Sequence, residues 1–274
     1  HVKAIDLAGN ESAYSDVRTF EVDTTAPTGL SISIDDDATY SNTTAVTLTL
    51  GAAGASHMRF KNEANGSWSS YEVYTTTKSW NLLNTQGSRT VLVQFKDEAG
   101  NETDGTTSDD IILDSVAPTA LSIVIDGGAT YATQMDVTLT LGATGASEMR
   151  FKNESTGTWS TYEAYGTSRV WDLGNTQGLR KVYVQYKDLA GNETYGSTFD
   201  SITLDTVAPS APALLLPGDG SFTNDNTVLL DWDASQTAVS YTIEWADNAS
   251  FTSASSYTTS STIYTTPTLL DATW

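Results

Sequence analysis

The chain has 274 residues, and its 13 basic and 34 acidic side chains give a formal net charge of −21. This charge argues against binding to nucleic acid or to an anionic membrane surface, because both depend on clustered Lys and Arg. The sequence has no cysteine and only two histidines, His1 and His57, which excludes disulfides, thiolate metal sites and histidine-rich clusters. No apolar run approaches the roughly 20 residues that span a bilayer, so we expect no membrane insertion.

An internal repeat of 91 residues organises the sequence. Residues 24–114 align without a gap to residues 115–205, and 57 of the 91 positions are identical. An Ala-Pro dipeptide recurs at the same spacing, as Ala26-Pro27, Ala117-Pro118 and Ala208-Pro209. These segments are tandem duplicates, and we refer to residues 24–114 as repeat 1 and to residues 115–205 as repeat 2.

Both ends of the chain follow the same register. Residues 6–11 (DLAGNE) precede residues 97–102 (DEAGNE) by 91 positions, so residues 1–23 match the last quarter of a repeat. Residues 206–274 match the beginning of one. Placing residues 270–274 before residues 1–6 gives a continuous strand pattern, and the Ala-Pro spacings then close at 91, 91 and 92 residues.

This closure predicts that residues 1–23 complete the domain begun by residues 206–274 of the preceding copy. Two arrangements satisfy it: one longer polypeptide that repeats every 274 residues, or subunits that join head-to-tail. An arbitrarily cut fragment of a multidomain protein is the alternative. The mass of the native polypeptide distinguishes the two arrangements. Separate subunits that join head-to-tail give a species of 29.3 kDa, whereas one continuous polypeptide gives a far larger one.

The predicted elements are strands, because apolar and polar residues alternate with a period of two. In chain order the clearest are residues 30–34 (LSISI), 46–50 (VTLTL) and 91–95 (VLVQF), which repeat 2 reproduces 91 residues later. Glycine- and asparagine-rich turns separate them. About seven short strands in 91 residues predict an immunoglobulin-like sandwich, with Trp80 or Trp171 as a large core residue.

Short linkers precede the three Ala-Pro dipeptides, at residues 23–27, 114–118 and 205–209. Proline fixes its own φ and pushes the preceding residue toward an extended conformation. Domains joined by such short segments are expected to form a rod with limited bending.

Two sets of motifs carry a resemblance to known families. Repeats 1 and 2, with residues 58–61 (MRFK), Trp68 and the Asp-x-Ala-Gly-Asn motif of residues 97–101, resemble bacterial Ig-like domains of large surface proteins. Residues 230–232 (LDW) and 240–245 (SYTIEW), with residues 264–267 (YTTP), are similar to a fibronectin type III-like module. The resemblance implies an all-β chain of tandem immunoglobulin-like and fibronectin type III-like β-sandwiches in a rod, located extracellularly or at the cell surface.

The predicted domain organisation follows from the repeat and the resemblance together. Residues 1–23 are the C-terminal strands of a fibronectin type III-like domain, and residues 24–114 and 115–205 are two Ig-like repeats. Residues 206–274 are the N-terminal part of a fibronectin type III-like domain.

The Asp-x-Ala-Gly-Asn motif lies in the predicted hairpin between the last two strands of each repeat. Asn and Gly favour such a turn, and the Asp side chain accepts hydrogen bonds from nearby amides. The sandwich topology places this hairpin near the linker that precedes its own domain, where several oxygens would suit Ca²⁺. We expect no required cofactor, but Ca²⁺ binding at the three domain junctions is a hypothesis. The candidate ligands are Asp23, Asp97 and Asn101 at the first junction, Asp114, Asp188 and Asn192 at the second, and Asp205 with Asp6 and Asn10 of the next copy at the third.

Aromatic residues on the predicted sheets suggest a second hypothesis. Trp68, Tyr71 and Tyr74, repeated as Trp159, Tyr162 and Tyr165, would either stack against a carbohydrate or form cross-strand pairs. The latter is the simpler interpretation. Sequons such as residues 65–67 (NGS) leave glycosylation open.

The sequence shows no catalytic constellation: no Ser/His/Asp set, phosphate-binding loop or dinucleotide motif is present. We therefore expect no catalytic residues and no enzyme activity. The predicted function is structural, a rod, stalk or filament of tandem domains whose partner is a further copy of itself. The alternative is an adhesin or a carbohydrate-binding spacer module.

Overall fold

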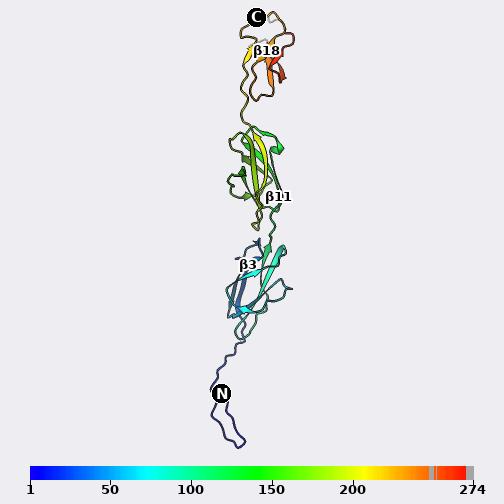
Figure 1. Cartoon of the computed structure of the whole chain (residues 1–274). Helices are drawn as coiled ribbons and strands as arrows, with labels where there is room; N and C mark the ends of the chain where they lie inside the picture. The colour runs from blue at the N-terminus through cyan, green and yellow to red at the C-terminus, as the bar shows by residue number, and fades with distance from the viewer. Residues whose placement is uncertain (247–249, 251, 270–274) are drawn as a thin grey trace. The chain divides into compact units, whose positions relative to one another are not determined.

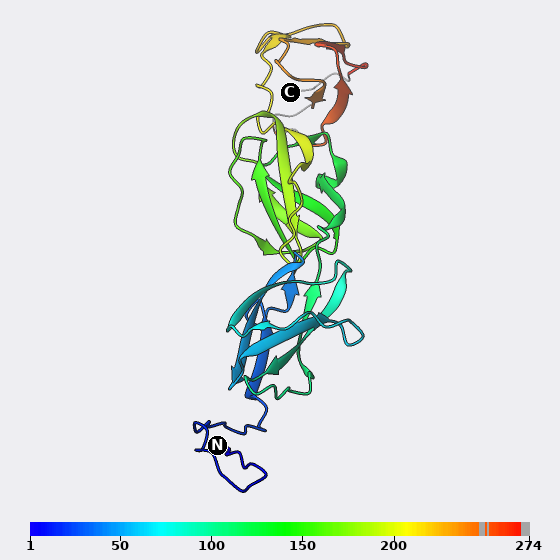
Figure 2. The same cartoon turned by 60° about the horizontal axis from the view of Figure 1, so that its bottom comes forward.

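A computed structural model describes residues 1–246, 250 and 252–269 of the chain. Strands account for its regular structure, apart from a single 3-10 turn at Asp126–Gly128 within these residues (Figures 1 and 2). The predicted strand over residues 270–274 lies outside the described residues. In the described part of the chain, no helix is long and apolar enough to cross a membrane.

The chain divides into two compact units, residues 1–131 with 135–203 and residues 132–134 with 204–274. The first unit contains most of both repeats. The second contains the segment that the sequence predicts to be fibronectin type III-like, and we call residues 204–269 the C-terminal segment.

Repeat 1 is a sandwich of two sheets. One sheet has the order β1 (Thr28–Ile34), β3 (Ala45–Ala53) and β6 (Thr77–Asn81), all antiparallel. The other has the order β2 (Tyr40–Ser41), β8 (Thr107–Leu113), β7 (Gly87–Lys96), β4 (His57–Asn62) and β5 (Glu72–Val73). The chain thus leaves the first sheet after β1 and joins the second through β2, which is parallel to β8.

Repeat 2 has the same strand order. Its first sheet is β9 (Thr119–Ile125), β11 (Asp136–Thr144) and β14 (Ser168–Asp172). Its second sheet is β10 (Tyr131–Ala132), β16 (Thr198–Leu204), β15 (Gly178–Lys187), β12 (Glu148–Asn153) and β13 (Glu163–Ala164). The prediction of tandem immunoglobulin-like β-sandwiches is therefore confirmed.

Alternating side chains of the two sheets form the core of each repeat. In β3 every second residue from Val46 is buried, and Phe60 of β4 and Phe95 of β7 are fully buried across from it. Trp80 packs against this core as predicted, but it is only half-buried and lies at the margin of the core. Its indole N–H needs an acceptor and finds Asn62 Oδ1 at 2.8 Å, while its ring lies 5.3 Å from that of Phe60.

Trp171 of repeat 2 occupies the same marginal position. Its ring lies 5.2 Å from that of Phe151, and its indole N–H donates to Asn153 Oδ1 at 2.8 Å. In both repeats the phenylalanines supply the buried aromatic volume.

The C-terminal segment forms a three-stranded and a two-stranded sheet. The first has the order β17 (Leu214–Leu216), β18 (Leu229–Trp232) and β21 (Ile263–Thr265), which corresponds to β1, β3 and β6 of repeat 1. The second pairs β19 (Tyr241–Trp245) with β20 (Ser255–Thr259), at the place of β4 and β5. Among the described residues of this segment, no strand takes the place of β7 or β8.

Backbone hydrogen bonds join residues 2–6 to residues 10–15 in a hairpin, and the chain then continues to repeat 1 (dark blue in Figure 1). We call residues 1–23 the N-terminal hairpin. An isolated bridge joins Ile5 to Glu11, at the position of the Lys96–Glu102 bridge in repeat 1. Its large apolar side chains are all more than 60% exposed: Val2, Ile5, Leu7, Tyr14, Val17, Phe20 and Val22.

Candidate functional site: the hairpin clasp and the cation–aromatic stack

The Asp-x-Ala-Gly-Asn motif of repeat 1 ties the hairpin between β7 and β8 to the preceding linker. Asp97 Oδ1 accepts the amide N–H groups of Gly100 and Asn101, both at 2.8 Å, and Gly100 adopts a φ of 97°. The Asn101 side-chain amide donates to Asp97 Oδ2 at 2.8 Å and to the Asp23 carbonyl at 3.0 Å. We call Asp97, Asn101 and the Asp23 carbonyl a hairpin clasp.

Repeat 2 has an equivalent clasp. The Asn192 side-chain amide donates to Asp188 Oδ2 at 2.9 Å and to the Asp114 carbonyl at 2.7 Å. The expected proximity of the hairpin to the linker before its own domain is therefore correct. The sequence did not predict that the linker contributes a backbone carbonyl. An Asn four residues after an Asp could have indicated it, because the Asn side-chain amide can donate both to that Asp and to a second acceptor outside the turn.

The third copy of the motif, in the N-terminal hairpin, forms the same turn. Asp6 Oδ1 accepts the Asn10 amide at 2.9 Å, and the Asn10 side chain donates to Asp6 Oδ2 at 2.8 Å. The hydrogen bonds of the Asn10 side chain and backbone are the main reason that the pKa of the Asp6 carboxyl is lowered.

The electrostatics of Asp97 follow from the clasp. Desolvation raises the pKa of its carboxyl, but the hydrogen bonds from the Asn101 side chain and from the amides of residues 99–101 outweigh this effect. The net result is a pKa below the ordinary value of 3.8. Asp97 is thus held as a carboxylate by its own turn.

The linker carboxylates proposed as calcium ligands cap their own turns. Asp23 Oδ1 accepts the Thr25 amide at 2.9 Å, Asp114 Oδ1 the Val116 amide at 3.0 Å, and Asp205 Oδ1 the Val207 amide at 3.1 Å. Within the described ranges, no group of three or more His, Cys, Asp or Glu side chains is arranged to hold a metal ion. Calcium at the junctions stays a prediction.

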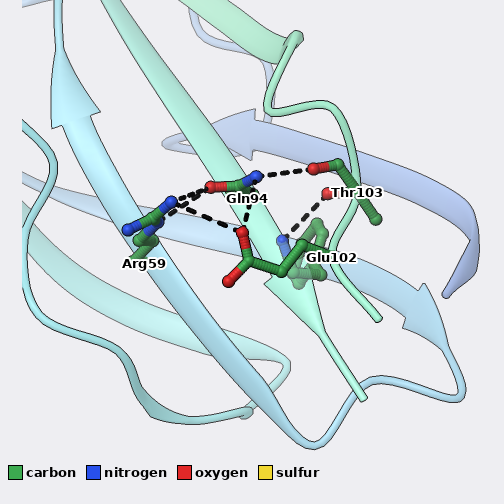
Figure 3. A network of polar contacts seen from close by, with 5 residues as sticks. Arg59, Gln94, Glu102 and Thr103 are labelled. Atoms are coloured by element: carbon green, nitrogen blue, oxygen red, sulfur yellow. Dashed lines mark hydrogen bonds and ion pairs between the residues drawn. The ribbon is translucent and has the colours of Figure 1, made fainter. Parts of the chain in front are cut away.

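A polar network lies on the outer face of the larger sheet (Figure 3). Arg59 donates from Nε to Gln94 Oε1 at 2.8 Å, and the Gln94 amide donates to the Thr103 carbonyl at 2.6 Å. Glu102 lies beside both, with its carboxylate 3.7 Å from Arg59 Nη2. The buried Gln94 therefore links β4 to the segment that follows the clasp.

A cation–aromatic stack covers the same face. Arg59 lies 5.3 Å from the ring centre of Trp68 and 4.5 Å from that of Tyr71. Lys61 lies 4.8 Å from the Trp68 ring, and Lys96 lies 4.2 Å from the Tyr71 ring. Repeat 2 reproduces all four contacts within 0.1 Å through Arg150, Lys152, Trp159, Tyr162 and Lys187.

This arrangement bears on the aromatic platform considered from the sequence. Trp68 and Tyr71 are half-buried against cations, and burial, with a smaller contribution from the Glu102 carboxylate, raises the pKa of Tyr71 to about 12. Tyr74 turns inward instead, with its hydroxyl accepting the Ala52 amide at 3.1 Å and its ring 5.8 Å from that of Phe95. The three rings do not form one open platform, and carbohydrate binding stays a prediction.

Comparisons with known proteins return structural neighbours. No protein family matches the sequence, and no curated protein matches it. The solved structure of Clostridium thermocellum CbhA fibronectin(III)-like modules is similar with 12% identity and a TM-score of 0.40, over 63% of this chain and 92% of that chain. The central fibronectin-III array of RIM-binding protein is similar with 11% identity and a TM-score of 0.25, over 78% and 73% of the two chains.

The chain is a tandem array of β-sandwich repeats with immunoglobulin-like topology, and this assignment rests on the two-sheet strand order of repeats 1 and 2.

Proposed function

We propose that this protein is a non-enzymatic structural element: a tandem array of β-sandwich domains that forms a rod, stalk or filament outside the cell or at its surface. The observation that supports it best is the hairpin clasp. Each clasp joins the hairpin of a domain to the linker that precedes it, through Asn101 and the Asp23 carbonyl or Asn192 and the Asp114 carbonyl.

The physical reason is that a linker held to its own domain has fewer backbone conformations available. A short linker with a proline and an anchored carbonyl therefore restricts the angle between one domain and the next. The net charge of −21 adds mutual repulsion between neighbouring rods, which keeps them soluble and apart.

Small-angle X-ray scattering of the full chain at low concentration tests this proposal. A strand of the length of β7, 10 residues, spans about 34 Å, so three domains in line extend over roughly 100 Å. A rod of that length has a radius of gyration of about 30 Å, whereas a compact chain of 274 residues has about 19 Å. The proposal predicts the larger value, and the smaller value would contradict it.

The same scattering experiment with and without EGTA tests the calcium prediction. If Ca²⁺ stiffens a junction, EGTA shortens the mean particle length and lowers the melting temperature. Identical curves and melting temperatures in both conditions would reject calcium while leaving the rod proposal intact.

A further inference from the structure

Repeat 2 carries more aromatic residues than repeat 1, although 57 of their 91 positions are identical. Repeat 1 contains seven Phe, Trp and Tyr residues, whereas repeat 2 contains ten. The three additional ones replace Leu, Asp and Ser of repeat 1, and they are Tyr183, Tyr195 and Phe199. All three belong to the larger sheet of repeat 2, in β15, in β16 or in the segment just before β16. The gain therefore falls on one surface of one repeat.

Two of these residues extend the cation–aromatic stack across the outer face of the sheet. The Lys152 ammonium lies 4.8 Å from the Trp159 ring and 5.4 Å from the Tyr183 ring. The Tyr183 ring lies 4.9 Å from that of Phe199, and Lys181 Nζ lies 5.2 Å from the Phe199 ring. Rings and cations thus form one continuous row. We call these five side chains the aromatic row: Trp159, Lys152, Tyr183, Phe199 and Lys181.

The aromatic row faces solvent and not the core. In β15 the two neighbours of Tyr183, Val182 and Val184, are fully buried, so the Tyr183 side chain points to the outer face. Phe199 is 46% exposed. Exposed aromatic side chains that gather on one face mark a site of association.

Tyr195 lies beside this row. A Cβ added to the adjoining Gly196 would lie 2.7 Å from Trp159 Cζ2, so the loop that carries Tyr195 runs along the Trp159 ring. Tyr195 is fully exposed. Repeat 1 has Asp104 at this position, and its carboxylate accepts the Thr106 amide at 3.1 Å. Repeat 2 therefore has an exposed ring where repeat 1 has a turn-capping carboxylate.

The charge of this surface changes together with its aromatic content. In repeat 1, the Asp110 carboxylate accepts the Thr90 hydroxyl at 2.5 Å, whereas repeat 2 has Ser201 and Lys181 at these two positions. Four cations of repeat 2 are each paired with a carboxylate: Arg150, Arg169, Arg180 and Lys187. In the part of the chain that the structure describes, Lys152 and Lys181 have no carboxylate partner. Two unpaired cations thus lie among exposed rings in a chain of 34 acidic and 13 basic side chains.

The chemistry of the row defines the ligand that would complement it. Aromatic rings pack against apolar C–H groups, and a lysine ammonium forms charge-assisted hydrogen bonds with a carboxylate. A uronic-acid sugar offers both groups in one unit, because the C–H groups of its ring form an apolar face and its sixth carbon is a carboxylate. A chain of such sugars repeats the two groups along its length, as the row does.

We propose that the aromatic row of repeat 2 binds an acidic polysaccharide, a chain that contains uronic-acid sugars. Its sugar rings pack on Tyr183 and Phe199, and its carboxylates bind Lys152 and Lys181. A folded protein partner fits less well, because a stable protein interface needs about 800 Å² on each side. One row of largely half-buried side chains exposes less than that.

The net charge of −21 is compatible with this ligand. At physiological salt, charges more than about 8 Å apart are largely screened, so the residues close to the row decide the contact. Repeat 2 lacks the two aspartates that repeat 1 has on this surface, Asp104 and Asp110. The binding activity goes beyond the proposed structural function and does not depend on it.

Titration calorimetry of the full chain with short oligosaccharides tests the inference. The acidic probes are oligomers of polygalacturonate, alginate and hyaluronan, and at least one is expected to bind with a dissociation constant below about 1 mM. EDTA is present throughout, so that no divalent cation bridges the ligand to carboxylates of the chain. Maltose oligomers of the same length and a polyglutamate peptide are the control probes, and both are expected to bind at least about tenfold more weakly.

Repeat 1 supplies variants whose side chains suit the same fold. Tyr183→Leu combined with Phe199→Ser introduces the residues of repeat 1 and is expected to weaken binding by about tenfold or more, because the sugar rings lose both aromatic surfaces. Lys181→Thr is expected to weaken it by about tenfold, through loss of a charge-assisted hydrogen bond. Circular dichroism should show a folded chain in each case.

Val170→Ser is the matched control. Val170 is 59% exposed in β14, where it pairs with Thr138 on the outer face of the smaller sheet. Repeat 1 has Ser79 at this position, so this variant also introduces a residue of repeat 1. It is expected to bind like the unaltered chain.

The reverse exchange tests whether the row is sufficient. In the chain that carries Tyr183→Leu and Phe199→Ser, the corresponding residues of repeat 2 are introduced into repeat 1. The four substitutions are Thr90→Lys, Leu92→Tyr, Ser108→Phe and Asp110→Ser. Binding of the acidic oligosaccharide is expected to return.

No binding of any acidic probe at about 1 mM would overturn the inference. Equal affinity for the maltose oligomers or for polyglutamate would overturn the assignment to an acidic polysaccharide. Equal effects of the Val170 and the Tyr183–Phe199 substitutions would overturn the site, as would a folded reverse-exchange chain that does not bind. None of these outcomes affects the proposed rod, because the variants leave the linkers and the clasps unchanged.

Discussion

A single asparagine in each clasp connects two parts of the chain that lie 78 residues apart. The Asn101 side-chain amide donates one hydrogen bond to Asp97 in the turn and another to the Asp23 carbonyl of the linker, which would otherwise be hydrogen-bonded by water. A hydrogen bond of this kind contributes about 1 kcal/mol to stability, and the linker conformation it selects adds an entropic term.

Replacement of Asn101 by Ala removes both side-chain hydrogen bonds and is expected to destabilise repeat 1 by about 1–2 kcal/mol. Hydrogen exchange of the Gly100 and Asn101 amides should become faster, because the turn loses its side-chain support. Asn65→Ala, at an exposed asparagine of the same repeat, is the control and should change neither quantity. Equal exchange rates in the two variants would contradict the clasp.

The pKa of Asp97 makes the clasp sensitive to acid. Because the folded pKa lies below the ordinary value of 3.8, the folded state binds fewer protons than the unfolded state between these values. The carboxylate therefore stabilises repeat 1 above pH 3.8, and its contribution is lost as the pH falls through the folded pKa. Melting curves between pH 2 and 6 should show a smaller acid-induced loss for Asp97→Asn; an unchanged dependence would contradict this assignment.

Among the elements, the loop between the clasp and β8 is fixed by its contact with the cation–aromatic stack. Gly105 has a φ of 73°, and a Cβ added there would lie 2.9 Å from Trp68 Cζ2. Gly54 has a similar φ of 85° but open space around it. Comparing alanine substitutions at the two glycines therefore distinguishes the cost of backbone strain from the cost of displacing Trp68.

Gly105→Ala and Gly54→Ala are each expected to lower the free energy of unfolding by about 1 kcal/mol, because alanine is strained at a positive φ. Gly105→Ala should lower it by about a further 1–3 kcal/mol, because its Cβ displaces Trp68. The difference is measured by denaturant unfolding, and a shift in tryptophan emission should accompany only Gly105→Ala. Equal losses and unchanged emission in both variants would show that the stack does not hold this loop.

The strands are the part of the fold that the sequence predicts best, because period-two patterns such as residues 46–50 read directly as half-buried strands. The two-residue strands β2 and β5 are too short to leave a pattern. Trp80 packs against the core but is less buried than its hydrophobic volume alone predicts, because its N–H donates to Asn62 at the margin of the core. Of the candidate site, sequence register predicted the approach of Asn101 to the linker but not its backbone acceptor.

At the scale of the whole molecule, the proposed rod depends on the two linkers that the clasps anchor. The linker before each repeat is held by a side-chain amide of that repeat, through Asn101 and the Asp23 carbonyl or through Asn192 and the Asp114 carbonyl. An anchored linker has fewer backbone conformations available, which limits bending between neighbouring domains.

Small-angle X-ray scattering of the unaltered chain and of Asn192→Ala, which releases the linker carbonyl of Asp114, tests the proposed rod most directly. The proposed rod predicts a radius of gyration of about 30 Å for the unaltered chain and a smaller value for Asn192→Ala. A radius of about 19 Å for the unaltered chain, or the same radius for both, would contradict it.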